Sequence, residues 1–181
     1  MYPANTVTLT ITDNNGNTST TTATVTVEDN VDPVAICQDI TVQLDASGQA
    51  SILPGDIDNG SNDACGIQSL ALDVTTFDCS NVGVNLVVLT VTDPNGNVST
   101  CSATVTVEDN VAPVITCVTN DIRDTDPGVC DYTVQGTEFD ATFTDNCSAG
   151  YITNDYNNSD SLAGAVFQHG TSVVTWTVND G

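Results

Sequence analysis

The chain has 181 residues, and 24 of them are acidic against a single basic residue, Arg123, so its formal net charge at pH 7 is -23. Nucleic-acid grooves and anionic membrane surfaces both attract clustered lysine and arginine, so this composition argues against either partner and favours cations. Apolar residues make up 39% of the chain and strong helix formers are scarce, which predicts strands and turns rather than a disordered acidic tail.

One segment occurs twice along the chain. Val7–Pro33 reads VTLTITDNNGNTSTTTATVTVEDNVDP and Val87–Pro113 reads VVLTVTDPNGNVSTCSATVTVEDNVAP, with 20 of the 27 positions identical. A third, partial copy, VVTWTVNDG, begins at Val173. Self-similarity of this kind indicates tandem structural repeats.

Each copy has the pattern of a β-hairpin followed by a linker. In the second copy, apolar side chains alternate along both predicted strands, at Val87, Leu89 and Val91 and again at Ala103, Val105 and Val107. Alternation predicts one buried face on each strand. The intervening Asp93–Asn97 supplies turn residues, and Pro113 ends the segment because proline cannot donate to a ladder.

This register predicts the domain boundaries. Residues 1–33 would be the last hairpin and linker of a preceding repeat, 34–113 a complete repeat, and 114–181 a repeat without its last strand. The chain then resembles a window cut from a longer array. The alternative is that another molecule supplies the missing strand, as in strand-donation polymers. Because the first segment carries both strands of its hairpin, the window is the favoured interpretation.

The complete repeat is expected to be an all-β, immunoglobulin-like antiparallel sandwich of about 80 residues. Its strands are predicted near Val34–Leu44, Gln49–Leu53, Ile67–Val74, Asn85–Thr92 and Ser99–Val107, with a short one near Phe77. No helix is expected. No apolar run is long enough to span a membrane, and Met1–Thr6 is too short and polar for a secretion signal, which would have to lie elsewhere.

Seven cysteines without a CxxC pair, and with a single histidine, predict disulfides and an oxidising compartment rather than a zinc site. Cys37 and Cys101 begin neighbouring strands at the same end of the predicted sandwich and are paired on that ground, which leaves Cys65 with Cys79. Four cysteines allow three connectivities, and the sequence does not choose among them. In the last repeat, Cys117 is expected to have no partner within the chain and Cys130 to pair with Cys147.

No catalytic residue is predicted. The one histidine, His169, falls in a turn, and no serine or cysteine has a base placed beside it in a known motif. The chain is therefore expected not to be an enzyme.

Acidic and amide side chains gather in the segments expected to meet where one repeat joins the next: the linker, the loop between the second and third strands, and the last hairpin turn. The candidate ligands are Glu28, Asp29, Asn30, Asp32, Asp56, Asp58, Asp63 and Asp93 at the first junction, and Glu108, Asp109, Asn110, Asp145 and Asp180 at the second. Such oxygens suit Ca²⁺, which takes six to eight hard ligands. The alternative is that these residues are ordinary solvated turn and cap residues.

Several motifs resemble the HYR (hyalin repeat) module, a domain related to the immunoglobulin fold. They are Pro113–Cys117, Asp126–Cys130, Asp145–Cys147 and Thr171–Gly181, while the complete repeat, with Asp63–Gly66 and Phe77–Gly83, resembles repeats of very large Bacteroidota surface proteins, including the mobile adhesins of gliding bacteria. The resemblance implies secretion, by the type IX route, to the extracellular cell surface. The complete repeat lacks the cysteine that corresponds to Cys130 in Asp126–Cys130 and carries Cys79 instead, so its disulfides are expected to differ.

The leading functional expectation is a stalk or filament of a surface adhesin, stiffened by calcium and disulfides, whose partners are the neighbouring repeats and a secretion or motility apparatus. Near-identical repeats suit length rather than recognition. Two alternatives stay open. The repeats themselves can bind surface glycans, with Tyr151, Tyr156 and Phe167 as candidate contacts, or they can polymerise by strand donation.

Overall fold

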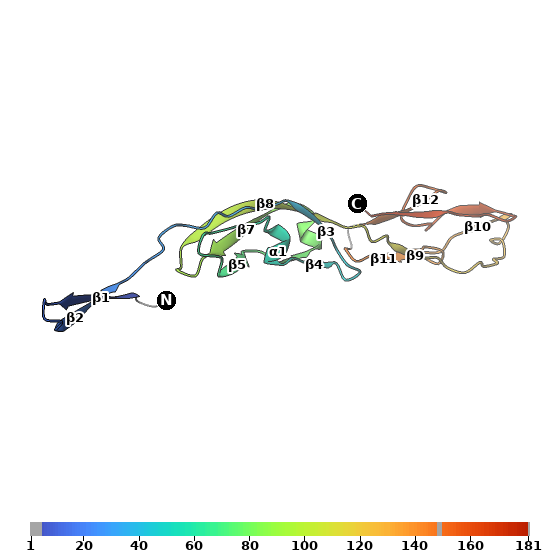
Figure 1. Ribbon diagram of the computed structural model, residues 1–181. Helices are drawn as coiled ribbons and strands as arrows, with labels where there is room; N and C mark the ends of the chain where they lie inside the picture. Colours follow the sequence, from blue (N-terminus) through green and yellow to red (C-terminus); the bar gives the residue numbers. More distant parts are fainter. Residues whose placement is uncertain (1–4, 148–149, 181) are drawn as a thin grey trace. The chain divides into compact units, whose positions relative to one another are not determined.

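The computed structural model describes residues 5–147 and 150–180 (Figure 1). Its regular elements are almost all β-strands, which confirms the all-β prediction. They are β1 (Asn5–Thr12), β2 (Thr18–Val25), β3 (Ile40–Gln43), β4 (Gln49–Ser51), β5 (Ser69–Leu72), β6 (Thr76–Asp78), β7 (Gly83–Thr92), β8 (Val98–Glu108), β9 (Val114–Thr116), β10 (Asp131–Thr133), β11 (Thr142–Thr144), β12 (Tyr151–Asn154), β13 (Val166–Gln168) and β14 (Trp176–Asn179).

Two single-turn helices were not predicted: α1 (Pro54–Ile57) and the 3-10 helix η1 (Cys79–Asn81). Pro54 stands in the first turn of α1, where its missing N–H costs nothing and its fixed φ suits a helix. The Asp56 carboxylate accepts a hydrogen bond from the backbone N–H of Leu53 at 2.7 Å, which closes the turn. These local capping residues outweigh the strand-rich surroundings.

The contacts of the chain group into two compact units. The first contains residues up to Thr41, Ser51–Thr75 and Val84–Thr106, and the second contains Val42–Ala50, Thr76–Gly83 and residues from Val107 onward. The strands β3 and β8 each begin in the first unit and end in the second.

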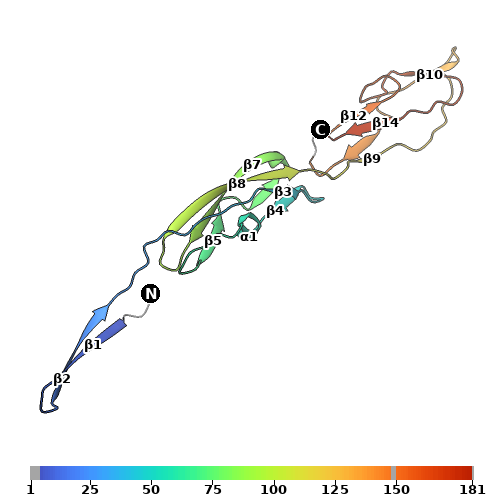
Figure 2. The ribbon, with the colours of Figure 1, turned by 45° about the horizontal axis from the view of Figure 1, so that its top comes forward.

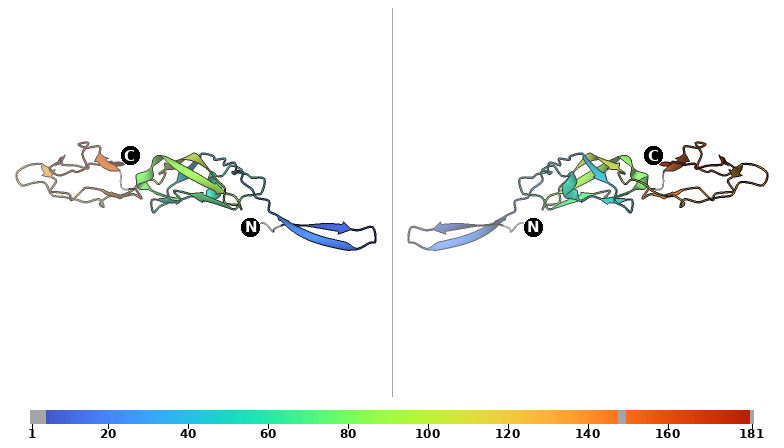
Figure 3. Two further views of the ribbon diagram at one scale, coloured as in Figure 1. Left: turned by 90° about the vertical axis from the view of Figure 1, so that its left-hand side faces the viewer. Right: turned by 90° about the vertical axis from the view of Figure 1, so that its right-hand side faces the viewer.

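The first unit begins with an antiparallel hairpin in which β1 pairs with β2 from Asn5↔Val25 to Thr12↔Thr18 (Figure 3). Asp13 closes its turn by accepting hydrogen bonds from the backbone N–H groups of Asn15 and Asn17, both at 2.8 Å. Every residue of both strands is exposed, including the apolar side chains of β1.

The same sequence is buried in its second copy. Strands β3, β8, β7 and β5 form a four-stranded sheet in that order (Figure 2), with β5 antiparallel to β7 from Ser69↔Thr92 to Leu72↔Leu89. The predicted inward side chains of β7 and β8 are at most 2% exposed: Val87, Leu89, Val91, Ala103, Val105 and Val107. A second, two-stranded sheet pairs β4 with β6, and Phe77 on β6 is also buried. The sheets and this core are consistent with the predicted sandwich.

The first predicted strand is shorter than expected. Only Ile40–Gln43 is regular, and Val34 and Cys37 instead form isolated bridges with Asn62 and Asp58. Side chains replace the missing ladder, since Ser61 Oγ accepts a hydrogen bond from the Ile36 N–H at 2.9 Å. The prediction of a continuous strand over 34–44 is therefore wrong.

Within the second unit, the residues from Val114 onward pair as β9 with β11, β10 with β13 and β12 with β14, all antiparallel. Val134, Ala141 and Leu162 are buried between these short strands, whereas Trp176 is only partly buried. The single arginine, Arg123, lies 2.8 Å from Asp121 and 3.2 Å from Glu138, so its positive charge is already engaged.

Two disulfides are present. Cys37–Cys101 confirms the pairing inferred from the strand order. Cys79 bonds Cys147, which contradicts both the Cys65–Cys79 and the Cys130–Cys147 pairs. Both predicted pairs lie within one predicted repeat, whereas the loop that carries Cys79 lies against the segment Asn146–Cys147 of the next repeat.

Cys117 and Cys130 are unpaired and exposed. The absence of a partner was predicted for Cys117 and not for Cys130. The two bridges indicate an oxidising environment. Among the described residues, no helix has the length and apolar character needed to cross a membrane.

Candidate cation-binding clusters

The two linkers place an aspartate in the same way. Asp29 and Asp109 stand at equivalent positions of the repeated segment, and the Oδ1 of each accepts a hydrogen bond from the valine N–H two residues on, at 3.0 and 3.1 Å. This is the local turn that aspartate favours. The other oxygen, Oδ2, is buried without a hydrogen-bond partner in both residues. Each linker therefore holds one carboxylate oxygen away from solvent and unsatisfied.

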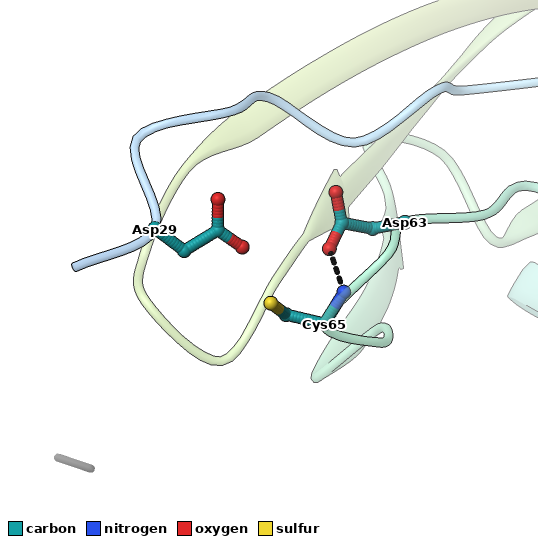
Figure 4. Close-up of side chains that lie close together, drawn as sticks. All are labelled: Asp29, Asp63 and Cys65. Carbon is teal, nitrogen blue, oxygen red and sulfur yellow. Dashed lines mark hydrogen bonds between the residues drawn. The ribbon is translucent and has the colours of Figure 1, made fainter. Parts of the chain in front are cut away.

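The first cluster consists of Asp29, Asp63 and Cys65, whose ligand atoms all lie within 4.8 Å of one another. Figure 4 shows the Asp29 and Asp63 carboxylates and the Cys65 sulfur directed toward the same space. The Cys65 N–H donates to Asp63 Oδ2 at 2.6 Å, which fixes the direction of that carboxylate. The cluster belongs entirely to the first unit.

The last hairpin turn holds the linker beside this cluster. Asn95 and Asn97 each donate a side-chain N–H to the carbonyl of Asp29 at 3.2 Å, and Asn97 also donates to the carbonyl of Val31 at 3.2 Å. Linker, turn and Asp63 are thus brought together, as the sequence predicted for this end of the repeat.

Asp93 supports that turn instead of facing the cluster. It is fully buried, and its carboxylate accepts hydrogen bonds from the Asn95 and Asn97 N–H groups and from Asn97 Nδ2, all between 2.8 and 2.9 Å. Burial by itself would raise the pKa of Asp93, but these hydrogen bonds, those from Asn97 foremost, lower it overall. The group stays ionised and has its oxygens occupied.

The prediction for the loop that contains Asp56, Asp58 and Asp63 needs correction, because only Asp63 belongs to the cluster. Asp56 caps α1, and Asp58 accepts hydrogen bonds from the N–H groups of Ser61 at 3.0 Å and Gly60 at 3.4 Å. Hydrogen bonding by Ser61 holds the pKa of Asp58 below its ordinary value despite some burial. The remaining predicted ligands of the first junction, Glu28, Asn30 and Asp32, are exposed and lie outside the cluster.

The second cluster consists of Asp109, Asp145 and Asp180, again with ligand atoms within 4.8 Å of one another and within a single unit. Asp145 accepts a hydrogen bond from the Cys147 N–H at 2.9 Å through Oδ2, while its Oδ1 is buried and unpartnered. Burial, and then the charges of Asp145 and Asp109, raise the pKa of Asp180. The three carboxylates repel one another, and the chain's only arginine is bound elsewhere.

Asn146 adds an amide to this cluster. Its Nδ2 donates to Asp109 Oδ1 at 3.0 Å and to the Asp45 carbonyl at 3.2 Å, and its Oδ1 is buried without a partner. Glu108 and Asn110, predicted as ligands, bind Gln43 instead: Gln43 Nε2 donates to Glu108 Oε2 at 2.6 Å, and Asn110 Nδ2 donates to Gln43 Oε1. They secure the start of the linker and do not join the cluster.

A shared Asp-x-Cys motif positions one aspartate in each cluster. Asp63-Ala64-Cys65 and Asp145-Asn146-Cys147 each have an aspartate that accepts the N–H of a cysteine two residues later. The interval from Asp63 to Asp145 is close to the one between the two copies of the repeated segment, and this agreement would have revealed the correspondence. The aspartate of each motif lies near the equivalent linker aspartate, so this pair of aspartates occurs twice, with Cys65 as the third member of one cluster and Asp180 of the other.

The oxygen donors of the two clusters suit a hard cation. The donors are carboxylate and amide oxygens, four of which are buried without any hydrogen bond: Asp29 Oδ2, Asp109 Oδ2, Asp145 Oδ1 and Asn146 Oδ1. A buried acceptor left unsatisfied is unfavourable, and a bound cation would satisfy it. The first cluster differs by including a thiol.

The aromatic residues suggested for ligand binding do not form one group. The rings of Tyr156 and Phe167 contact each other at a tilt of 48° with centroids 4.7 Å apart, and the Tyr156 hydroxyl donates to the Val166 carbonyl at 2.5 Å. Tyr151 lies on β12, where its hydroxyl accepts a hydrogen bond from Asn179 at 3.0 Å. Comparison with known proteins adds no assignment, since no family model matches the chain and no curated protein was found to match it.

Proposed function

We propose that the chain is a repeat region of the hyalin-repeat type in a large bacterial surface adhesin, where it acts as an extracellular stalk stiffened by calcium at its linkers. The observation that carries the proposal is the duplicated arrangement of a linker aspartate, with one buried and unpartnered oxygen, against the aspartate of an Asp-x-Cys motif. A stalk needs the same stiffening feature at each of its linkers, and this pair of aspartates is present at both linkers of the chain.

Charge supports a cation at these positions. The second cluster gathers three carboxylates within 4.8 Å, and burial first, then the charges of Asp145 and Asp109, raise the pKa of Asp180. Calcium fits better than magnesium, because it accepts irregular oxygen cages, whereas Mg²⁺ demands near-ideal octahedral geometry. The proposed partners are the neighbouring repeats, and the proposed role is structural rather than enzymatic.

The test is the response to calcium and to a chelator. Calcium at 100 times its dissociation constant should stabilise the folded chain by about 2.7 kcal/mol per site, and magnesium should do less. Chelation should increase cleavage by proteases within 29–33 and 109–113 and change the maximum dimension measured by small-angle X-ray scattering.

Two variants sharpen the experiment. Asp29→Asn combined with Asp109→Asn should abolish the calcium response while leaving the chain folded. Asp124→Asn removes an exposed carboxylate outside both clusters and is the matched control. If scattering and protease patterns are identical with calcium and with chelator, the clusters are solvated turns and the stiffening mechanism fails.

A second candidate, polymerisation by strand donation, is supported by the exposed apolar face of the hairpin β1–β2. Its apolar residues Val7, Leu9 and Ile11 are 55–64% exposed, whereas their counterparts on β7 are fully buried. Such a face favours packing against a repeat body of the same kind. Concentration-dependent growth in light scattering, lost on Leu9→Asp, would support this candidate over an isolated stalk segment.

A further inference from the structure

The Cys79–Cys147 bridge joins two of the predicted repeats next to the second cluster. Cys79 belongs to η1, within the sequence of the complete repeat, and Cys147 belongs to the last repeat. Cys147 directly follows Asp145 and Asn146, and its N–H orients the Asp145 carboxylate. The bridge therefore ends one residue from one cluster member and two from another.

Asn146 is held at this point from several sides. Its carbonyl oxygen lies 3.5 Å from Cys79 Sγ, a packing contact, since a disulfide sulfur carries no proton. Its side-chain amide binds the Asp45 carbonyl and Asp109 Oδ1. Gly48 completes the enclosure at φ +73°, where an added Cβ would lie 2.7 Å from Cys79 Sγ and 3.0 Å from the Asn146 carbonyl oxygen.

The Asn146 amide thus links the segment that holds Asp145 to those of Asp45 and Asp109, and the bridge fixes that same segment to Cys79. Without it, Asp145 and Asn146 would have to be ordered by the cation itself, and the cost of that ordering would weaken binding. With it, the oxygens are held in place before the ion arrives.

We propose that the Cys79–Cys147 disulfide is a positioning element of the second cluster, so that cation binding by Asp109, Asp145 and Asp180 depends on this bridge. The inference rests on the proposed function, because it assumes a cation at that cluster. The first cluster, Asp29, Asp63 and Cys65, shares no residue with the bridge and its affinity does not depend on it.

Coupling of this kind is reciprocal. If the bridge strengthens cation binding by a given factor, the cation must shift the reduction equilibrium of the bridge by the same factor. Dithiothreitol supplies two electrons and two protons to the disulfide, gives two cysteine thiols and is itself oxidised to its cyclic disulfide. Saturating calcium should therefore protect Cys79–Cys147 and leave Cys37–Cys101 unaffected.

The experiment measures calcium binding by calorimetry on the full chain carrying Asp29→Asn, which confines binding to the second cluster. Cys79→Ser with Cys147→Ser should weaken calcium binding about tenfold, within the usual range of coupling. Cys37→Ser with Cys101→Ser, which removes the other bridge, should leave the affinity unchanged. Gly48→Ala should weaken binding without altering any cysteine, and circular dichroism verifies that each variant is folded.

The outcomes separate the two proposals. If Asp29→Asn binds calcium and the loss of Cys79–Cys147 leaves its affinity unchanged, the positioning role is wrong while calcium binding stands. Should the variant without Cys79–Cys147 fail to fold, two other measurements decide. The inference is overturned if Gly48→Ala binds calcium with unchanged affinity and calcium slows the reduction of neither disulfide more than that of the other. Two results together would refute the proposed function and this inference with it. The Asp29→Asn variant would bind no calcium, and the Asp109→Asn variant would bind calcium as the unsubstituted chain does.

Discussion

Leu9 and Leu89 occupy the same position of the repeated segment and so provide a matched pair of substitutions. Leu89 is fully buried on β7, and Leu9 is 58% exposed on β1. Leu89→Ala removes three buried carbon atoms, which costs roughly 2.4 kcal/mol in transfer free energy, and the cavity raises the loss to about 3–5 kcal/mol. Leu9→Ala should change the free energy of unfolding by less than about 0.5 kcal/mol.

The assay is thermal and urea unfolding followed by circular dichroism. In a domain of about 80 residues, a loss of about 3 kcal/mol lowers the melting temperature by roughly 12–24 °C. The contrast between the two variants is therefore large. If Leu9→Ala destabilises the chain as much as Leu89→Ala does, the hairpin face is covered in solution. Repeating the measurement over a range of protein concentrations would then show whether a second copy covers it.

Three further predictions concern titration, thiols and ligand binding. Because the folded-state pKa of Asp180 is raised, its contribution to stability is present below the ordinary aspartate value and is lost as pH rises through the folded pKa. In chelator, Asp180→Asn should therefore gain stability relative to the unmodified chain as pH rises through this window, measured by urea midpoints. Alkylation of the native chain followed by mass spectrometry should label the exposed thiols of Cys117 and Cys130, and absence of label would contradict their exposure. On a glycan array the purified chain should not bind, and binding that is lost on Tyr151→Ala with Tyr156→Ala would favour an adhesive role over a stalk.

The strands β7 and β8 were predictable because the hydrophobic pattern determines them locally. Alternation in Val87–Val107 gave the buried face of β7 and β8, and turn residues gave the hairpin between them. The pairing of Cys37 with Cys101 followed from the order of those strands. Each of these inferences needed only the period of a strand and the register of the repeat.

The remaining features depend on contacts that no local pattern specifies. The Cys79–Cys147 bridge crosses a repeat boundary, so an argument confined to single repeats assigned other partners. Asp56 and Asp63 stand in one acidic loop, and only the short helix α1, which recruits Asp56 as a cap, separates their roles. Asp-rich loops contain more carboxylates than one ion can use, and the choice among them depends on which are already hydrogen-bonded.

The two disulfides interleave along the chain, and this has a consequence for a protein under tension. Cys79 lies between Cys37 and Cys101, and Cys101 lies between Cys79 and Cys147. A pull applied beyond Cys37 and Cys147 therefore passes through both bridges and only the segment from Cys79 to Cys101, instead of the whole segment from Cys37 to Cys147. At about 3.4 Å per residue, the fully extended chain along this path is roughly 75 Å long rather than roughly 370 Å. Even if every strand in it were pulled apart, the extended length between Cys37 and Cys147 would be about a fifth of that of the same chain without the bridges.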